Sequence, residues 1–147
     1  MRLLSLSLFA AILLMFFMPM NLNAQDIPYD EGSVWEISYI KTKPPYFEDY
    51  IENLGTGWKK VMDQAKKEGL ILDYMVLSSD AANRNDWDLM LMIEYKNMAA
   101  LDNLEPRMQK IQASLFGGEE ERKAGALARN DIREMLGTRL VRELHIK

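Results

Sequence analysis

Residues 70–95 read LILDYMVLSSDAANRNDWDLMLMIEY, and this stretch decides the fold. Two apolar runs, 70–78 and 87–95, lie on either side of a polar loop rich in Asp and Asn. Two strand patterns this close in sequence pair with each other, so the stretch predicts an antiparallel hairpin. The second run alternates strictly, which is typical of a strand with two different faces. One of these faces carries Trp87, Leu89, Leu91, Ile93 and Tyr95, and the other carries Asp88, Met90, Met92 and Glu94.

The sequence around this hairpin supplies the remaining elements. An alternating pattern predicts a strand over 33–41, and apolar residues at three- and four-residue spacing predict a helix over 46–68. A helical region follows over 97–136, with its last helix at about 119–136, and a final strand is predicted over 138–146. This order predicts an α+β, ferredoxin-like βαββαβ fold, in which helices cover one face of a four-stranded antiparallel sheet. Right-handed crossovers then place the first and third strands at the centre.

Two glycines, Gly55 and Gly57, interrupt the predicted helix over 46–68. Each costs about 1 kcal/mol relative to alanine in a helix interior. A kink explains them, and a close approach by another backbone or a ligand is the alternative.

The sheet is expected to be apolar on both faces. We assign the face with Trp35, Ile37 and Tyr39, together with the Trp87–Tyr95 set, to the helices. An uncovered face should be plainly polar, yet here it mixes apolar and polar side chains. A second copy of the same sheet is the simplest cover, which predicts a homodimer formed through the sheet. The residues expected on this second face are Val34, Ile40, Ile71, Met75, Leu77, Met90, Met92, Val141, Glu36, Ser38, Asp73, Asp88, Glu94, Glu143 and His145.

Composition excludes several classes of protein. The 147 residues contain no Cys and one His, which rules out disulfides, thiolate metal sites and multi-His metal centres. We therefore expect no metal site and no cofactor. A net charge of −4 argues against a nucleic-acid interface, which needs a basic face.

Residues 1–24 differ from the rest of the chain. Arg2 is followed by an apolar stretch that is shorter than the roughly 20 residues of a spanning helix, and Ala24 precedes a polar sequence. This pattern predicts a signal peptide cleaved near Ala24 and a periplasmic or secreted protein without a membrane anchor after cleavage. Residues 25–32 are predicted to be a polar lead-in, and residues 33–147 the domain.

Three segments resemble the dimeric α+β barrel superfamily, and within it small exported bacterial members of unassigned function. They are Val34-Trp35-Glu36-Ile37, Gly57-Trp58-Lys59-Lys60-Val61-Met62 and Asp86-Trp87-Asp88-Leu89-Met90-Leu91. The resemblance covers residues 33–147 and implies a ligand cavity between sheet and helices. Known members include cofactor-free monooxygenases, haem-binding and haem-degrading enzymes, and muconolactone-type isomerases. This chain departs from the haem-binding members because its predicted helices carry no His, and its helical region after the third strand is longer than the simplest members need.

Candidate ligand-binding residues are the aromatic side chains expected between sheet and helices, because aromatic walls with a few polar tips suit a flat apolar ligand. They are Trp35, Tyr39, Tyr50, Trp58, Trp87 and Tyr95. Plain core packing is the alternative for this set. The polar candidates are Glu36 and His145, and Glu143 could pair with His145. Their catalytic roles are unknown.

Three functions agree with these patterns. The first is an exported homodimer that binds a small apolar or aromatic molecule between sheet and helices. The second is a cofactor-independent enzyme resembling a monooxygenase or isomerase. The third is a structural or partner-binding dimer with a filled core.

Overall fold

The computed structural model describes residues 26–147, so the predicted signal peptide lies outside the described residues. The order of elements is that of the prediction, strand, helix, strand, strand, helix, strand. The elements are β1 (Tyr29–Thr42), α2 (Phe47–Asn53), the π-helical turn η1 (Leu54–Trp58), α3 (Lys59–Lys67), β2 (Asp73–Ser78), β3 (Leu89–Tyr95), the short 3-10 helix η2 (Met98–Leu101), α4 (Leu104–Phe116), α5 (Glu119–Ile132) and β4 (Arg133–Ile146).

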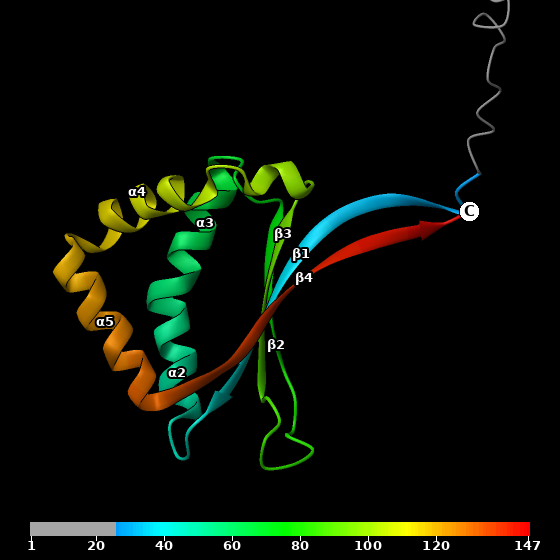
Figure 1. Cartoon of the computed structure of the whole chain (residues 1–147). Helices are drawn as coiled ribbons and strands as arrows, with labels where there is room; N and C mark the ends of the chain where they lie inside the picture. The colour runs from blue at the N-terminus through cyan, green and yellow to red at the C-terminus, as the bar shows by residue number, and fades with distance from the viewer. Residues whose placement is uncertain (1–25) are drawn as a thin grey trace, which may run out of the picture.

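The four strands form one antiparallel sheet in the order β2-β3-β1-β4. The prediction that the first and third strands are central is therefore confirmed. Both helical layers, α2–α3 and α4–α5, lie on the same side of the sheet (Figure 1). The topology is that of a ferredoxin-like fold.

The last crossover ends earlier than predicted. The sequence predicts a helix to residue 136, but α5 ends at Ile132 and β4 begins at Arg133. The first residues of β4 already pair with the end of β1, Arg133 opposite Thr42 and Met135 opposite Ile40. Pairing with β1 thus outweighs the helical preference of this segment, and the predicted boundary was wrong for that reason.

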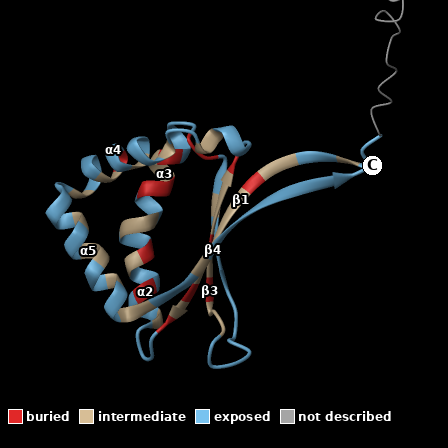
Figure 2. Cartoon of the chain, in the orientation of Figure 1, coloured by how far each residue is buried: buried red, intermediate tan, exposed pale blue. Residues whose placement is uncertain are grey.

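The outer halves of β1 and β4 form a two-stranded arm that projects beyond the helices (Figure 1). β1 begins at Tyr29, inside the predicted lead-in, and pairs there with Ile146. Ion pairs tie the two strands: Lys147 lies 3.0 Å from Asp30, and Arg142 contacts Glu31. Most of the β4 side of the arm is exposed (Figure 2).

The predicted helix over 46–68 is continuous as α2, η1 and α3. Its buried stripe includes Tyr50, Leu54, Val61, Met62 and Ala65, whereas Ile51, which was expected in the same stripe, is 39% exposed. Gly55 and Gly57 lie in the π-helical turn, where an added Cβ would meet no atom within 4 Å at either position. Within residues 26–147, no other backbone approaches these glycines closely, and they mark a local irregularity of the helix.

The core beneath the helices has two parts. One is built around Val34, Val61 and Ile111, and the other around Ile40, Tyr50 and Leu89. Trp58 packs against both. The covered side of the sheet is thus buried at two ends, with Trp58 between them.

The face of β1 that meets the helices is the opposite of the predicted one. Residues directly opposite each other in an antiparallel pair share a face. Val34 lies opposite Tyr95 and Ile40 opposite Leu89, and all four are buried. Trp35, Ile37 and Tyr39 lie opposite Glu94, Met92 and Met90, on the face without helices. β1 carries large apolar side chains on both faces, so its own alternation could not show which face is covered.

The uncovered face is nevertheless apolar, as predicted, although its membership differs. Met75, Leu77 and Val141 are 38–43% exposed, and the central strands contribute partly exposed side chains. Of the residues predicted here, Val34, Ile40 and Ile71 are buried, and Glu36 and Ser38 lie on the helix side. We call this face the open face and define it by Trp35, Ile37, Tyr39, Met75, Leu77, Met90, Met92, Glu94, Arg139 and Val141.

Candidate ligand-binding cavity

A cavity of about 540 Å³ lies between the helices and the covered face of the sheet. Its volume falls in the usual range for small-molecule sites. It occupies the region between the two parts of the core, where Trp58 lies. The structure therefore holds a hollow where the sequence left open a choice between a cavity and plain packing.

The walls of the cavity are mainly apolar in the middle. The first helical layer contributes Leu54, Trp58, Val61 and Met62, and the β3 strand contributes Leu91 and Ile93. Trp58 is held edge-on against Tyr74, with ring centroids 5.2 Å apart and planes at 88°. The Tyr74 hydroxyl donates to Asp63, which also pairs with Lys59 at 2.7 Å. These contacts fix the indole from outside the cavity.

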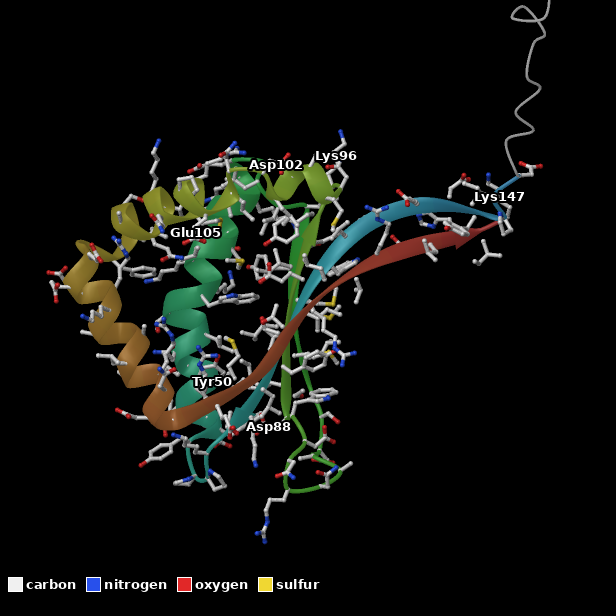
Figure 3. The ribbon with its side chains drawn as sticks, viewed as in Figure 1. Tyr50, Asp88, Lys96, Asp102, Glu105 and Lys147 are labelled. Carbon is white, nitrogen blue, oxygen red and sulfur yellow. The ribbon has the colours of Figure 1, made fainter. Side chains whose placement is uncertain are left out.

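One end of the cavity carries two arginines, which we call the arginine corner (Arg129 and Arg133). Arg129 comes from the last turn of α5 and Arg133 from the first residue of β4. The Arg133 guanidinium lies 5.4 Å from the centroid of the Tyr50 ring, an arrangement in which a cation is attracted to the ring face. Figure 3 shows Tyr50 at this end of the molecule, with Asp88 nearby.

The arginine corner is electrostatically unfavourable as it stands. Burial lowers the pKa of Arg129, and the positive charge of Arg133 lowers that pKa further. Burial raises the pKa of the Tyr50 hydroxyl, while the charges of Arg133 and Arg129 oppose that rise. The Nε atom of Arg133 is buried and has no hydrogen-bond partner within the described residues.

Asp88 lies close enough to Tyr50 to raise the pKa of its hydroxyl, but its own hydrogen bonds go to Thr42. Its two carboxylate oxygens accept the backbone N–H of Thr42, each at 3.0 Å, and it also accepts the Thr42 hydroxyl. Asp88 therefore ties the hairpin loop to the end of β1. Across residues 26–147, no carboxylate oxygen lies within 4.0 Å of a guanidinium nitrogen of Arg129 or Arg133.

An acidic residue of β1, Glu36, also lines the cavity. Glu36 and Ser38 both line the cavity, and the Tyr95 hydroxyl donates to Glu36 Oε2 at 3.4 Å. Burial and the negative charge of Glu36 raise the pKa of Tyr95, so this hydroxyl stays protonated at neutral pH. Thr42, which lies opposite Arg133, is six positions along β1 from Glu36, so the backbones of Glu36 and Thr42 are about 20 Å apart along the strand.

The predicted site residues divide between the two faces. Tyr50 and Trp58 line the cavity together with Glu36, and Tyr95 lies behind Glu36. Their part in ligand binding stays a prediction. Trp35, Tyr39 and Trp87 were expected in the same place, and this placement was wrong: Trp35 and Tyr39 are on the open face, and the Trp87 ring lies 6.0 Å from that of Tyr39. The reversed orientation of β1 explains Trp35 and Tyr39, whereas Trp87 precedes β3 and does not follow the alternation of that strand.

His145 lies on the arm, away from the cavity. It is exposed, and its Nε2 atom is 3.8 Å from Glu143 Oε2, so the predicted pairing of these two residues is present. No role in the cavity follows for it.

The sequence analysis missed the arginines. The apolar residues Ala124, Leu127 and Ala128 have the spacing of a core-facing stripe, but Leu127 is 59% exposed and the face of α5 that lines the cavity carries Glu121, Arg122, Gly125 and Arg129. The three- and four-residue spacing of this set was a signal, but the apolar stripe beside it had the same period. Arg133 could not be found while it was placed inside a helix.

Comparison of the chain with protein-family models and with curated proteins finds no match. A solved structure with a similar arrangement is a protein from Bacteroides fragilis NCTC 9343, described as dimeric, of unknown function and with a ferredoxin-like fold. It is 14% identical, the match covers 76% of this chain and 95% of that chain, and the TM-score is 0.42. The fold assignment given above rests on the strand order and connections of this chain itself.

Within residues 26–147, no helix is long and apolar enough to cross a membrane. The same residues contain no cluster of three or more His, Asp or Glu side chains that could hold a metal ion.

Proposed function

We propose that this protein binds a small, largely apolar molecule in the cavity between sheet and helices. The observation that carries the proposal is the cavity itself, a space of about 540 Å³ in the middle of the covered face. Trp58, Leu91 and Ile93 supply apolar surface, and polar side chains, among them Glu36, Glu121 and Arg129, line the rest of the cavity. Such walls are typical of sites that hold a ligand by burial and orient it by a small number of polar contacts. The cavity argues against a purely structural role with a filled core.

The two glycines of the π-helical turn provide a matched test of this proposal. Gly57 lines the cavity, whereas Gly55 is exposed and does not. An added Cβ meets nothing within 4 Å at either position, and neither glycine has a positive φ. Gly57→Phe therefore fills part of the cavity, while Gly55→Phe places the same side chain in solvent.

The probe is N-phenyl-1-naphthylamine, a neutral dye whose fluorescence rises in apolar surroundings. We expect the wild-type protein and Gly55→Phe to bind it equally well. Gly57→Phe should weaken binding about fivefold or more, corresponding to about 1 kcal/mol. Equal binding by all three proteins, or no binding by the wild type, would show that the cavity is not a ligand site.

We also propose that two copies pair through the open face. Aromatic and methionine side chains of β1 and β3 leave an apolar surface on a face that water would otherwise cover, and such surfaces usually mark interfaces. A twofold pairing brings the same surface of each copy together. The cavity lies on the opposite face, so each copy would keep its own.

Export is part of the proposed function. Residues 1–24 have the charge and hydrophobicity pattern of a signal peptide. Mass spectrometry of the protein recovered from a periplasmic or secreted fraction should find a chain that begins at Gln25. An intact N-terminus beginning at Met1 would contradict export by this signal.

A proton-transfer enzyme is the second candidate, because a carboxylate lines the apolar cavity. Glu36 reaches it from the sheet and accepts from Tyr95 at 3.4 Å, which gives a base with a neighbouring proton donor. Glu36→Gln keeps the size of the side chain and removes the base. If the protein exchanges a substrate proton with solvent, this variant should lose that exchange about a hundredfold while keeping ligand affinity.

A further inference from the structure

We infer that the molecule held in the cavity is an organic anion with an apolar body, a carboxylate whose charged end meets the arginine corner. This inference rests on the proposed ligand-binding function and adds the chemical class of the ligand. Two cations beside each other at the end of an apolar cavity are the feature that requires an explanation.

The cost of this arrangement is visible in the geometry. Arg129 and Arg133 line the same cavity, and Arg133 stands close enough to lower the pKa of Arg129. Neither is paired with a carboxylate anywhere in residues 26–147. Partly buried like charges without a counterion destabilise a protein, and such groups are normally paired. An anion bound between the two guanidinium groups removes their repulsion.

A carboxylate fits better than a more highly charged group. The planar guanidinium donates two parallel N–H groups that match the two oxygens of a carboxylate. Two acids, Glu36 and Glu121, also line the cavity and would repel a second negative charge on the ligand.

The position of Glu36 also sets the direction in which the ligand lies. The backbone of Arg133 pairs with Thr42, six positions along β1 from Glu36, and Trp58, Leu91 and Ile93 are among the apolar residues of the cavity walls. A ligand with its carboxylate at the arginines places its apolar body against Trp58 and keeps its charge away from Glu36. The reverse orientation would bring two carboxylates together.

Structural use of the arginines is the competing explanation. Arg133 contacts the Tyr50 ring, and this contact alone could retain it. A purely structural role gives no preference for a charged ligand over a neutral one of the same shape, so the two explanations differ in a measurable way.

The experiment compares naphthalene-2-carboxylate with naphthalene-2-carboxamide, its neutral isostere, by isothermal titration calorimetry at neutral pH and low salt. We expect the wild-type protein to bind the carboxylate about tenfold or more tightly than the amide, as charge-assisted hydrogen bonds imply. The double variant Arg129→Met/Arg133→Met keeps the apolar stems, and its carboxylate-to-amide ratio should fall to about one. Each single arginine variant should have a carboxylate-to-amide ratio between those of the wild type and the double variant.

Arg107→Met is the matched control, since Arg107 is an exposed residue of α4 that does not line the cavity. It should keep the wild-type ratio. Added salt should lower the ratio of the wild type, because screening weakens the charge term only.

The outcomes separate the two proposals. Equal affinity of the wild type for carboxylate and amide, with both lost in Gly57→Phe, overturns the anion inference and leaves the cavity as a ligand site. A carboxylate preference that survives in the double arginine variant also overturns it. Failure of both probes to bind, or binding that Gly57→Phe does not weaken, overturns the proposed function itself.

Discussion

In the middle of β1, the two faces of the sheet reverse the usual distribution of polarity. The face beneath the helices carries Glu36 and Ser38 in the middle of its central strand, whereas the open face carries Trp35, Ile37 and Tyr39 in the same strand. A covered face normally excludes polar groups and an uncovered face normally collects them. This contrast is the basis of the two proposals above, a small molecule on the inside and a second copy of the chain on the outside.

The largest expected effect is the difference in stability loss between truncating Ile40 and truncating Ile37, both in β1. Ile40 is fully buried beneath the helices, while Ile37 is partly exposed on the open face. Ile40→Ala should lower the free energy of unfolding by about 3 kcal/mol, and Ile37→Ala should lower it by less than about 1 kcal/mol in the monomer. Urea denaturation at a concentration where the protein is monomeric measures both. Equal losses would mean that both faces are packed within one chain.

The next effect tests the partner expected on the open face. Ile37→Asp places a charge in the middle of this face, so we expect the dimer dissociation constant to rise about fiftyfold, measured by sedimentation velocity. Ile51→Asp is the control, because Ile51 is exposed on α2 and does not belong to the open face. A wild-type protein that sediments as a monomer at micromolar concentration would contradict the proposed dimer.

A smaller effect is the pH dependence of folding stability, which we expect from Tyr95 and Glu36. The folded protein raises the pKa of Tyr95 above its ordinary value of 10.0 through burial and the charge of Glu36. Above about pH 10 the unfolded chain loses the Tyr95 proton and the folded chain keeps it, so stability falls as pH rises. Tyr95→Phe should flatten this alkaline fall by about one proton in the pH dependence of unfolding. Glu36→Gln should flatten it in part, and an unaltered slope in Tyr95→Phe would contradict the assignment.

The smallest effect concerns the polar pair on the covered face. The hydroxyls of Ser38 and Thr138 lie 3.0 Å apart. The pair is exposed, so water can replace the lost partner, and Ser38→Ala should lower the free energy of unfolding by less than about 0.5 kcal/mol, as should Ser38→Ala with Thr138→Val. Thermal unfolding of the single and double variants measures both losses. A double variant less stable than the single one would show that the pair has another role.

The topology could be predicted because it depends on local patterns. The hairpin over 70–95 and the helix over 46–68 each carry a strong period, and short connections then leave one arrangement of strands. The apolar character of the open face was predictable for a related reason, since both faces of β1 and β3 are rich in large apolar side chains.

The contents of the cavity could be predicted only in part. Shifting a strand by one residue exchanges its two faces, and nothing in the sequence of β1 shows which face meets the helices. Glu36 was therefore expected on the open face and Trp35 in the cavity, the reverse of what the register gives. The arginine corner forms only where α5 ends and β4 begins, and that boundary depends on pairing between residues 42 and 133, distant in sequence.

The divided core described above has a consequence for the response to hydrostatic pressure. Compression favours states of smaller volume, and unfolding removes internal space that the folded chain encloses. The hollow between the part around Val34 and the part around Ile40 is such a space. Pressure should therefore loosen the helical layer over Trp58 before it disrupts either part, and a molecule that fills the hollow should make the protein stiffer and more resistant to compression.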